Sequence, residues 1–314
     1  MTSVLITGAG GFTGLHLVRY LREKGDQVFG FDQVPVGQPS APKHEEVGAY
    51  HGDIRNRAIL KQTLSQARPE TIFHLAGILK SDNVQRFYEI NVIGTLTLLE
   101  TVVESSLKPR LLIASSSAVY GWGVGSRPIS EQFRLRPVTH YAVSKVAQEA
   151  VAGRYCRVHD LPIICTRAFN VIGPGQPPEY ACSGFARQIA LAEQAGRAGT
   201  IMAGNLSSRR DFTDIRDVVR AYDMVAQLGK PGHIYNICTQ KAVSIQQCLD
   251  VLLGLARVPL EIRVDAARLQ AEDVPIQVGS AAKLFDRTGW QPRITLQRSL
   301  KDLLEYWRQQ VGAI

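Results

Sequence analysis

The segment TGAGGFTG, residues 7–14, constrains the fold of this chain more than any other stretch. It follows the apolar run SVLIT and precedes GLHLVRYLREKG, where leucine and valine recur at helical spacing. Glycine at positions 8, 11 and 14 permits a tight turn and a close approach of the backbone to a pyrophosphate. The helix N-terminus behind the turn offers free N–H groups to that anion. The pattern therefore predicts a dinucleotide-binding turn between a strand and a helix.

An acid at the end of the next strand strengthens this prediction. The run QVFGFD ends in Asp32, 18 residues after Gly14. A carboxylate there can accept both hydroxyls of an adenosine ribose and would repel a 2′-phosphate. The alternative is a glycine-rich turn beside an exposed acid, but strand, turn, helix and acid all fall where the motif requires. We therefore expect NAD(H) to be the preferred cofactor.

Strands and helices alternate along the first half of the chain. After QVFGFD come the apolar runs TIFHLAG, RLLIASS and PIICTRAFN, separated by longer segments. This alternation predicts an α/β fold with a doubly wound parallel sheet covered on both faces. It breaks after Asn170, where VIGPGQPPEYACSG is rich in Gly and Pro. We expect a dinucleotide-binding domain over residues 1–170, a return of the chain to it near 209–240, and a smaller, mainly substrate-binding lobe over 171–314.

Composition and charge exclude several classes of protein. No apolar run reaches the ~18 residues that a membrane helix needs, and the N-terminal MTSVLITGAG lacks the basic region of a signal peptide. The five cysteines are scattered, which favours reduced thiols and a cytoplasmic protein. The net charge of +8 is spread along the chain, so we expect a phosphorylated small molecule as ligand, and neither nucleic acid nor a membrane as partner.

The second chemical motif is YAVSK, in which Tyr141 and Lys145 are four residues apart. On a helix this spacing puts both side chains on one face. A phenol has a pKa near 10, and an adjacent ammonium favours the phenolate, which would bring its proton into a useful range. A surface Tyr and Lys would be the simpler interpretation. Ser116 argues against it, because this hydroxyl lies at the carboxyl end of a predicted strand, where α/β sheets bind ligands.

Together these motifs resemble the extended short-chain dehydrogenases/reductases that act on nucleotide sugars, over nearly the whole chain. GDI at 52–54 resembles the family's adenine-contacting loop, HLAG at 74–77 the strand end along the cofactor, and NVIGT follows in the family's order. The resemblance implies a Rossmann domain followed by a small substrate lobe. Besides the catalytic Tyr141 and Lys145, which also contact the cofactor, it implies these cofactor-binding residues: Gly8, Gly11, Phe12, Gly14, Asp32, Asp53, Ile54, Leu75, Ala76, Gly77 and Asn91.

The resemblance also assigns roles within SSSAVYG, residues 115–121. Ser116 takes the place of the family's catalytic Ser or Thr, which hydrogen-bonds the C4 oxygen of the sugar while Tyr141 exchanges the proton. Dehydratases of the family that act across C5 and C6 carry a Glu two residues before the motif's Tyr. This chain has Ala118 there, whose methyl group cannot move a proton. A dehydratase is therefore disfavoured, which leaves reduction of a 4-keto group or 4-epimerisation.

The C-terminal half is similar to one branch of the family, the bacterial GDP-4-keto-6-deoxy-D-mannose reductases that make GDP-D-rhamnose. The similarity lies in RAFNVIGPGQ, GNLSSRRDFTDIRDVVRAY, YNICT and TGWQPRITLQRSL. Members of this branch often accept NADP(H) as well as NAD(H). These reductases tend to carry an arginine where this chain has Gln270, so the nucleotide base stays open. The substrate-binding residues that the resemblance implies are Ser117, Asn170, Arg210 and Asp273.

Two other functions remain open at this stage. SSSAVYG is also common in epimerases, so an NAD-dependent NDP-sugar 4-epimerase is the main alternative. A non-catalytic NAD-sensing regulator is disfavoured, because Ser116, Tyr141 and Lys145 are all present. No metal site is expected. In the family, helices that match residues 91–106 and 141–155 pair across a two-fold axis, which implies a homodimer.

Overall fold

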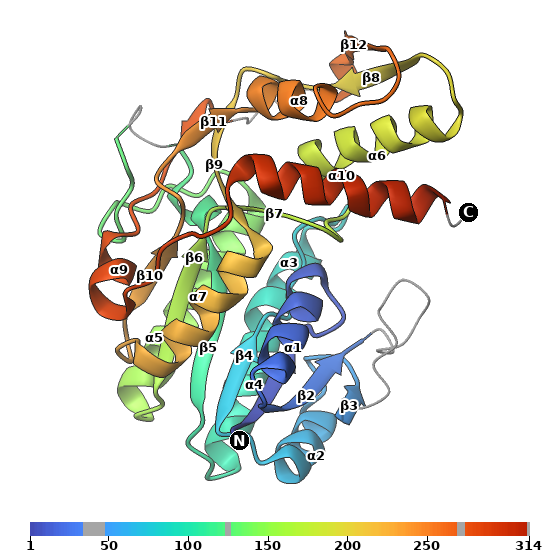
Figure 1. The fold of residues 1–314 in the computed structure, drawn as a ribbon. Helices are drawn as coiled ribbons and strands as arrows, with labels where there is room; N and C mark the ends of the chain where they lie inside the picture. The colour runs from blue at the N-terminus through green and yellow to red at the C-terminus, as the bar shows by residue number, and fades with distance from the viewer. Residues whose placement is uncertain (34–47, 123–126, 269–273, 313–314) are drawn as a thin grey trace.

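The computed structural model describes residues 1–33, 48–122, 127–268 and 274–312. A parallel sheet of seven strands, in the order β10-β6-β5-β4-β1-β2-β3, forms the body of the molecule (Figure 1). The order reverses between β1 and β4, as in a doubly wound Rossmann sheet, so the predicted fold class is confirmed. The bounds of these strands are β1 Ser3–Thr7, β2 Gln27–Asp32, β3 Gly48–His51, β4 Thr71–His74, β5 Arg110–Ser116, β6 Ile163–Ala168 and β10 Ile234–Ile237.

Helices cover both faces of the sheet, and each face has its own apolar core. One core joins α1, α7 and α9 to the sheet, and the other joins α2, α4 and α5 to it. The middle strands are apolar on both faces; Leu111, Leu112 and Ile113 of β5 are all buried. The bounds of these helices are α1 Phe12–Glu23, α2 Arg57–Ala67, α4 Gly94–Glu104, α5 His140–Val158, α7 Ile215–Leu228 and α9 Ala282–Thr288.

The second lobe lies at one end of the sheet and has a separate core (Figure 1). Helices α6, Ala181–Gln194, α8, Ile245–Leu253, and α10, Leu296–Gly312, supply most of that core. Strands β8 and β12 pair with each other, while β9 pairs with β7, β11 and β13. Their bounds are β7 Asn170–Ile172, β8 Gly199–Ala203, β9 Arg209–Asp214, β11 Ala242–Ser244, β12 Leu260–Val264 and β13 Ile276–Gln277.

Three features of the chain path bear on the site. The predicted run PIICTRAFN divides into β6 and β7 at Phe169. Strand β10 pairs with β6, so a segment far beyond residue 170 lies in the main sheet; the domain boundaries themselves stay a prediction. Short helical segments also approach the carboxyl ends of β4 and β5: α3 Gln85–Tyr88, a π-helical turn Glu89–Ile93 and a 3-10 turn Ser117–Tyr120. Among the helices of the described ranges, none has the length and apolarity needed to cross a bilayer.

Candidate active site

The turn between β1 and α1 is built so closely that glycine is required at two positions. Gly8 has a φ of +78°, and a Cβ on it would lie 2.7 Å from the amide nitrogen of Ala76. A Cβ on Gly14 would collide with the carbonyl oxygen of Gly8. Helix α1 begins after Gly11, and its first residues line a large cavity. This narrow turn, with a helix N-terminus aimed at open space, fits a pyrophosphate.

The two acids predicted to contact adenosine lie in different surroundings. Asp32, at the end of β2, accepts a 2.8 Å hydrogen bond from the backbone N–H of Gly10. Asp53 is held by the guanidinium of Arg55, with Oδ2 2.6 Å from Nη2, and this contact lowers the pKa of the Asp53 carboxyl. Ile54 is buried in the core between the sheet and α4, where its side chain packs against Gly94. Asp32 thus accepts from the turn that follows β1, whereas Asp53 is paired with a cation.

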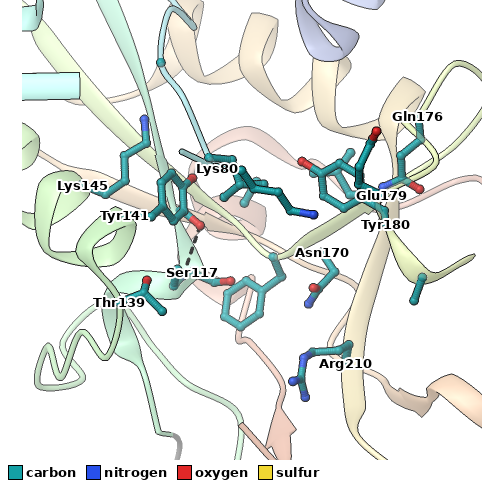
Figure 2. Close-up of a pocket in the computed structure, with 18 of the residues that line it drawn as sticks. Lys80, Ser117, Thr139, Tyr141, Lys145, Asn170, Gln176, Glu179, Tyr180 and Arg210 are labelled. Atoms are coloured by element: carbon teal, nitrogen blue, oxygen red, sulfur yellow. Dashed lines mark hydrogen bonds between the residues drawn. The ribbon is translucent and has the colours of Figure 1, made fainter. Parts of the chain in front are cut away.

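A cavity of about 1440 Å³ lies beside this turn, between the sheet and the second lobe. Figure 2 shows Tyr141, Ser117 and Thr139 on one side of it and Tyr180, Glu179 and Gln176 on the other. The predicted residues that line it are Phe12, Leu75, Gly77, Ser116, Ser117, Tyr141, Lys145, Asn170 and Arg210. The other predicted residues within the described ranges are not among those that line it: Gly8, Gly11, Gly14, Asp32, Asp53, Ile54, Ala76 and Asn91. Asp273 falls outside the described residues.

The three consecutive serines at the end of β5 have three different surroundings. Ser115 is buried and donates to Glu149 Oε1 at 2.6 Å. Ser116 lines the cavity, accepts from the backbone N–H of Ala118 at 3.2 Å and hydrogen-bonds the phenol of Tyr141. Ser117 donates to Gln277 Oε1 at 3.1 Å. Ser116 is therefore the serine that meets Tyr141, and Ala118 lines the same cavity.

Tyr141 and Lys145 lie on one face of α5, as their spacing predicts, but the expected electrostatic effect is wrong for this structure. Burial raises the pKa of Tyr141 to about 12, although its hydrogen bond to Ser116 acts in the opposite direction. Lys145 Nζ lies 6.0 Å from the centre of the Tyr141 ring and points away from the phenol oxygen (Figure 2). Desolvation of the phenolate is thus the dominant effect on the pKa of Tyr141. Burial also lowers the pKa of Lys145 to about 8.

Asn91 acts on the site through the backbone. Its side chain is fully buried; Oδ1 accepts from the N–H of Ile78 at 2.8 Å, and Nδ2 donates to the carbonyl of Ile78 and to Ser144 Oγ. These contacts fasten the loop after β4 to helix α5. The predicted role of Asn91 in cofactor binding would therefore be indirect, through Gly77 and Ile78 of that loop.

Several residues that line the cavity were not predicted from the sequence. Lys80 extends between the two sides of the cavity, with Nζ 6.0 Å from the ring centre of Tyr180 (Figure 2). Gln277 comes from β13 and is bonded reciprocally to Ser117, since its Nε2 donates to the Ser117 carbonyl at 3.1 Å. Lys80 follows a predicted strand end and could have been suspected from that position. Gln277 is 160 residues from Ser117, and only the fold brings the two together.

Comparisons with known proteins identify the family and the fold. The family model described as GDP-mannose 4,6 dehydratase matches residues 5–303. The GDP-6-deoxy-D-mannose reductase of Pseudomonas aeruginosa is 31% identical over 98% of each chain. The solved structure of RMD from Pseudomonas aeruginosa with NADPH superposes with a TM-score of 0.87 at 30% identity, covering 99% of this chain and 100% of that one. UDP-glucose 4-epimerase from Thermus thermophilus with NAD gives a TM-score of 0.87 at 26% identity, covering 99% of each chain.

Proposed function

This chain belongs to the GDP-mannose 4,6 dehydratase family, and from that premise we propose that it is a 4-reductase of nucleoside-diphosphate 4-keto-6-deoxy sugars. The proposed reaction is NAD(P)H-dependent reduction of the C4 keto group, with GDP-4-keto-6-deoxy-D-mannose as substrate and GDP-D-rhamnose as product. The observation that carries this proposal is Ala118, which lines the cavity beside Ser116 and Tyr141. An alanine there cannot serve the proton transfers of a dehydratase.

The residues present fit a dinucleotide. The turn at Gly8 and Gly14 and the start of α1 would hold the pyrophosphate, Asp32 would accept the adenosine ribose hydroxyls, and Lys145 would lie near the nicotinamide ribose. When bound, a nicotinamide cofactor supplies the hydride for C4. Asp32 at the end of β2 favours NAD(H), and the structure of RMD with NADPH is a reason to test NADP(H) too.

Tyr141 would donate the proton that the C4 alkoxide needs. A phenol with a pKa of about 12 stays protonated at neutral pH, which is the form a general acid requires. Ser116, hydrogen-bonded to that phenol, would align the C4 oxygen. The ammonium of Lys145, 6.0 Å from the centre of the Tyr141 ring, would add only a longer-range stabilisation of negative charge on the Tyr141 oxygen as the proton leaves.

The far part of the cavity suits a nucleoside diphosphate. Arg210 of β9 and Asn170 of β7 line it, and Figure 2 shows them together on the side of the second lobe. A guanidinium binds a diphosphate by charge and by paired hydrogen bonds. Lys80 adds a further cation to the cavity, besides Arg210 and Lys145. We assign the sugar to the space between Tyr141 and Tyr180 and the diphosphate to the neighbourhood of Arg210.

The second candidate is an NDP-sugar 4-epimerase, favoured by the likeness to the Thermus thermophilus enzyme. Both reactions would use Ser116, Tyr141 and Lys145. They differ in stoichiometry: a reductase consumes one NADH for each sugar, while an epimerase returns the hydride to its product.

One experiment separates these functions. The protein is incubated with NADH and a panel of NDP-4-keto-6-deoxy sugars, and in parallel with NDP-hexoses and NAD, with products identified by mass and NMR. We expect stoichiometric NADH oxidation and a 4-hydroxy product from a ketosugar. Interconversion of NDP-hexoses without net NADH oxidation would establish the epimerase, and binding of NADH without any turnover would establish the regulator.

We also propose a cytoplasmic homodimer. The cysteines at positions 156, 165, 182, 238 and 248 are free thiols, as suits a reducing compartment. Ile93 and Val143, on the segments expected at the two-fold interface, expose 48% and 38% of their surface in the single chain.

A further inference from the structure

Gln148 is the polar partner of Lys145 on helix α5. Lys145 Nζ donates to the Ala114 carbonyl at 2.8 Å and to Gln148 Oε1 at 2.9 Å, and the Lys145 and Gln148 side chains are buried. A lysine ammonium only donates, so the Gln148 atom that faces it must be the carbonyl oxygen. The orientation of the Gln148 amide is thereby assigned by its neighbour.

The other end of the Gln148 amide is fixed by a chain of buried hydroxyl and imidazole groups. Gln148 Nε2 donates to Thr95 Oγ1 at 2.7 Å, and Thr95 gives its own hydrogen to the Asn91 carbonyl at 2.7 Å. Thr95 Oγ1 must therefore also accept from His74 Nε2, 2.8 Å away, and His74 Nδ1 accepts from the Thr7 hydroxyl at 2.7 Å. Burial lowers the pKa of His74 to about 3, so the ring stays neutral and keeps this direction.

We propose that Gln148 is a positioning residue for Lys145, whose ammonium it holds at the carboxyl end of β5, facing Gly77 and the cavity. A Cβ on Gly77 would lie 3.5 Å from Lys145 Nζ, which shows how close the ammonium comes to the cavity wall. Within the part of the chain that the structure describes, two of its three N–H groups have acceptors, in Ala114 and Gln148, and we assign the third to a ligand. The inference rests on the proposed function only in that Lys145 belongs to that active site.

Gln148 supplies a neutral acceptor, and this matters for the charge of Lys145. Burial lowers the pKa of Lys145 to about 8, while Glu149 acts in the opposite direction. Glu149 itself is bound by Arg167, with Oε2 2.6 Å from Nη2. Because Gln148 binds the ammonium form, its loss should lower the pKa of Lys145 further, and a carboxylate in its place should raise it. The titratable groups around Lys145 are Tyr141, Glu149, Cys165 and His74. Arg167 faces Glu149.

The direct test follows the titration of Lys145 in the full chain by NMR with ¹³C-labelled lysine, its signal being assigned by its absence in Lys145→Arg. We expect the midpoint to fall by about one pH unit in Gln148→Leu and to rise by about one unit in Gln148→Glu, the size of one hydrogen bond to a charged group. Gln188→Leu is the matched control: this amide on α6 bonds Gly184 and Met202 and should leave the Lys145 midpoint unchanged.

A second readout is the pH profile of kcat with a ketosugar that the wild type reduces. If the ammonium is the active form, activity falls as pH rises through the pKa of Lys145. The alkaline limb of the profile should then shift to lower pH in Gln148→Leu and to higher pH in Gln148→Glu. A purely structural role would lower kcat without opposite shifts of this limb.

Either of two results would overturn the inference: midpoints equal to wild type in both Gln148 variants, or shifts of the same sign in both. If Gln148→Leu fails to fold, the rise expected in Gln148→Glu decides alone. If the wild type reduces no ketosugar, the proposed function fails, but the NMR titration still decides the role of Gln148.

Discussion

At the scale of the residue, the division of labour among Ser115, Ser116 and Ser117 follows from strand geometry. Side chains alternate along β5, so Ser115 points to the same face as Leu111 and Ile113, which α5 covers, and meets Glu149. Ser116 is the last residue of the strand and meets Tyr141 in the first turn of α5. The strand ends at Ser116, and the turn that follows directs Ser117 to Gln277. One hydroxyl is thus bound in the core, one lies beside the proposed proton donor and one contacts the second lobe.

Removing the hydroxyl of Tyr141 should abolish most of the activity. Tyr141→Phe keeps the ring but removes the proposed proton donor, so kcat should fall by ~10²–10⁴-fold with NADH affinity nearly intact. Ser116→Ala should cost less, because it removes an aligning hydrogen bond and not the proton. Single-turnover NADH oxidation with a 4-ketosugar nucleotide measures both. Tyr180→Phe, the same change on the opposite side of the cavity, should stay within about tenfold of wild type. A wild-type rate in Tyr141→Phe would show that another group is the acid.

Asp32 should set the choice of cofactor. A carboxylate at the end of β2 repels a 2′-phosphate, so kcat/KM should be higher with NADH than with NADPH. Asp32→Asn removes that charge and should reduce the preference by about tenfold or more. Asp53→Asn is the control acid, since its partner is Arg55, and it should leave the ratio of the two cofactors unchanged. Equal kcat/KM values for NADH and NADPH in the wild type would contradict the role of Asp32.

At the scale of the element, the β1–α1 turn should tolerate no side chain at Gly14. Gly14→Ala places a Cβ against the Gly8 carbonyl, which should cost about 1–3 kcal/mol of stability and weaken NADH binding because the turn must open. Thermal unfolding and NADH fluorescence titration measure these effects. Gly254→Ala, at the exposed end of α8, makes only an ordinary contact at 3.5 Å and should change stability by less than about 0.5 kcal/mol. Wild-type NADH affinity in Gly14→Ala would argue against pyrophosphate binding at this turn.

The same elements show what sequence can and cannot predict. Strands β1, β2, β4 and β5 could be predicted because each is a short, buried, apolar run next to a glycine or a polar turn. Strands β7, β11 and β13 are two or three residues long and exist through pairing with β9, so their own sequences carry almost no signal.

Some features of the candidate active site could likewise be predicted from the sequence, and others could not. The spacing of Tyr141 and Lys145 was enough to predict that they share one face of a helix, because this feature depends on α5 alone. The direction of Lys145 Nζ depends on Ala114 of β5 and on Gln148, and the pKa of Tyr141 depends on burial by the assembled cavity. Both required the fold.

At the scale of the whole molecule, the cavity needs both lobes. Ser116 and Tyr141 come from the sheet and α5, while Tyr180 and Arg210 come from segments after residue 170. The reciprocal bonds between Ser117 and Gln277 join the two parts next to the proposed catalytic residues. In the proposed function, the sheet and α5 would supply the catalytic residues, and the second lobe would enclose the substrate.

The last prediction is that two chains pair through the face of α4 and α5. Ile93, at the end of the π-helical turn before α4, and Val143 of α5, which also borders the cavity, are 48% and 38% exposed in the single chain. A stable dimer buries about 800 Å² on each partner. Light scattering at micromolar concentration should give twice the 34.6 kDa mass of the chain. Ile93→Glu and Val143→Glu should each shift the mass toward the monomer, because a charge in the interface would lose water without gaining a partner. Val264→Glu, at a 63% exposed position on β12, should leave the dimer intact. A wild-type protein of monomeric mass, or a dimer that survives both charged variants, would rule out pairing through this face.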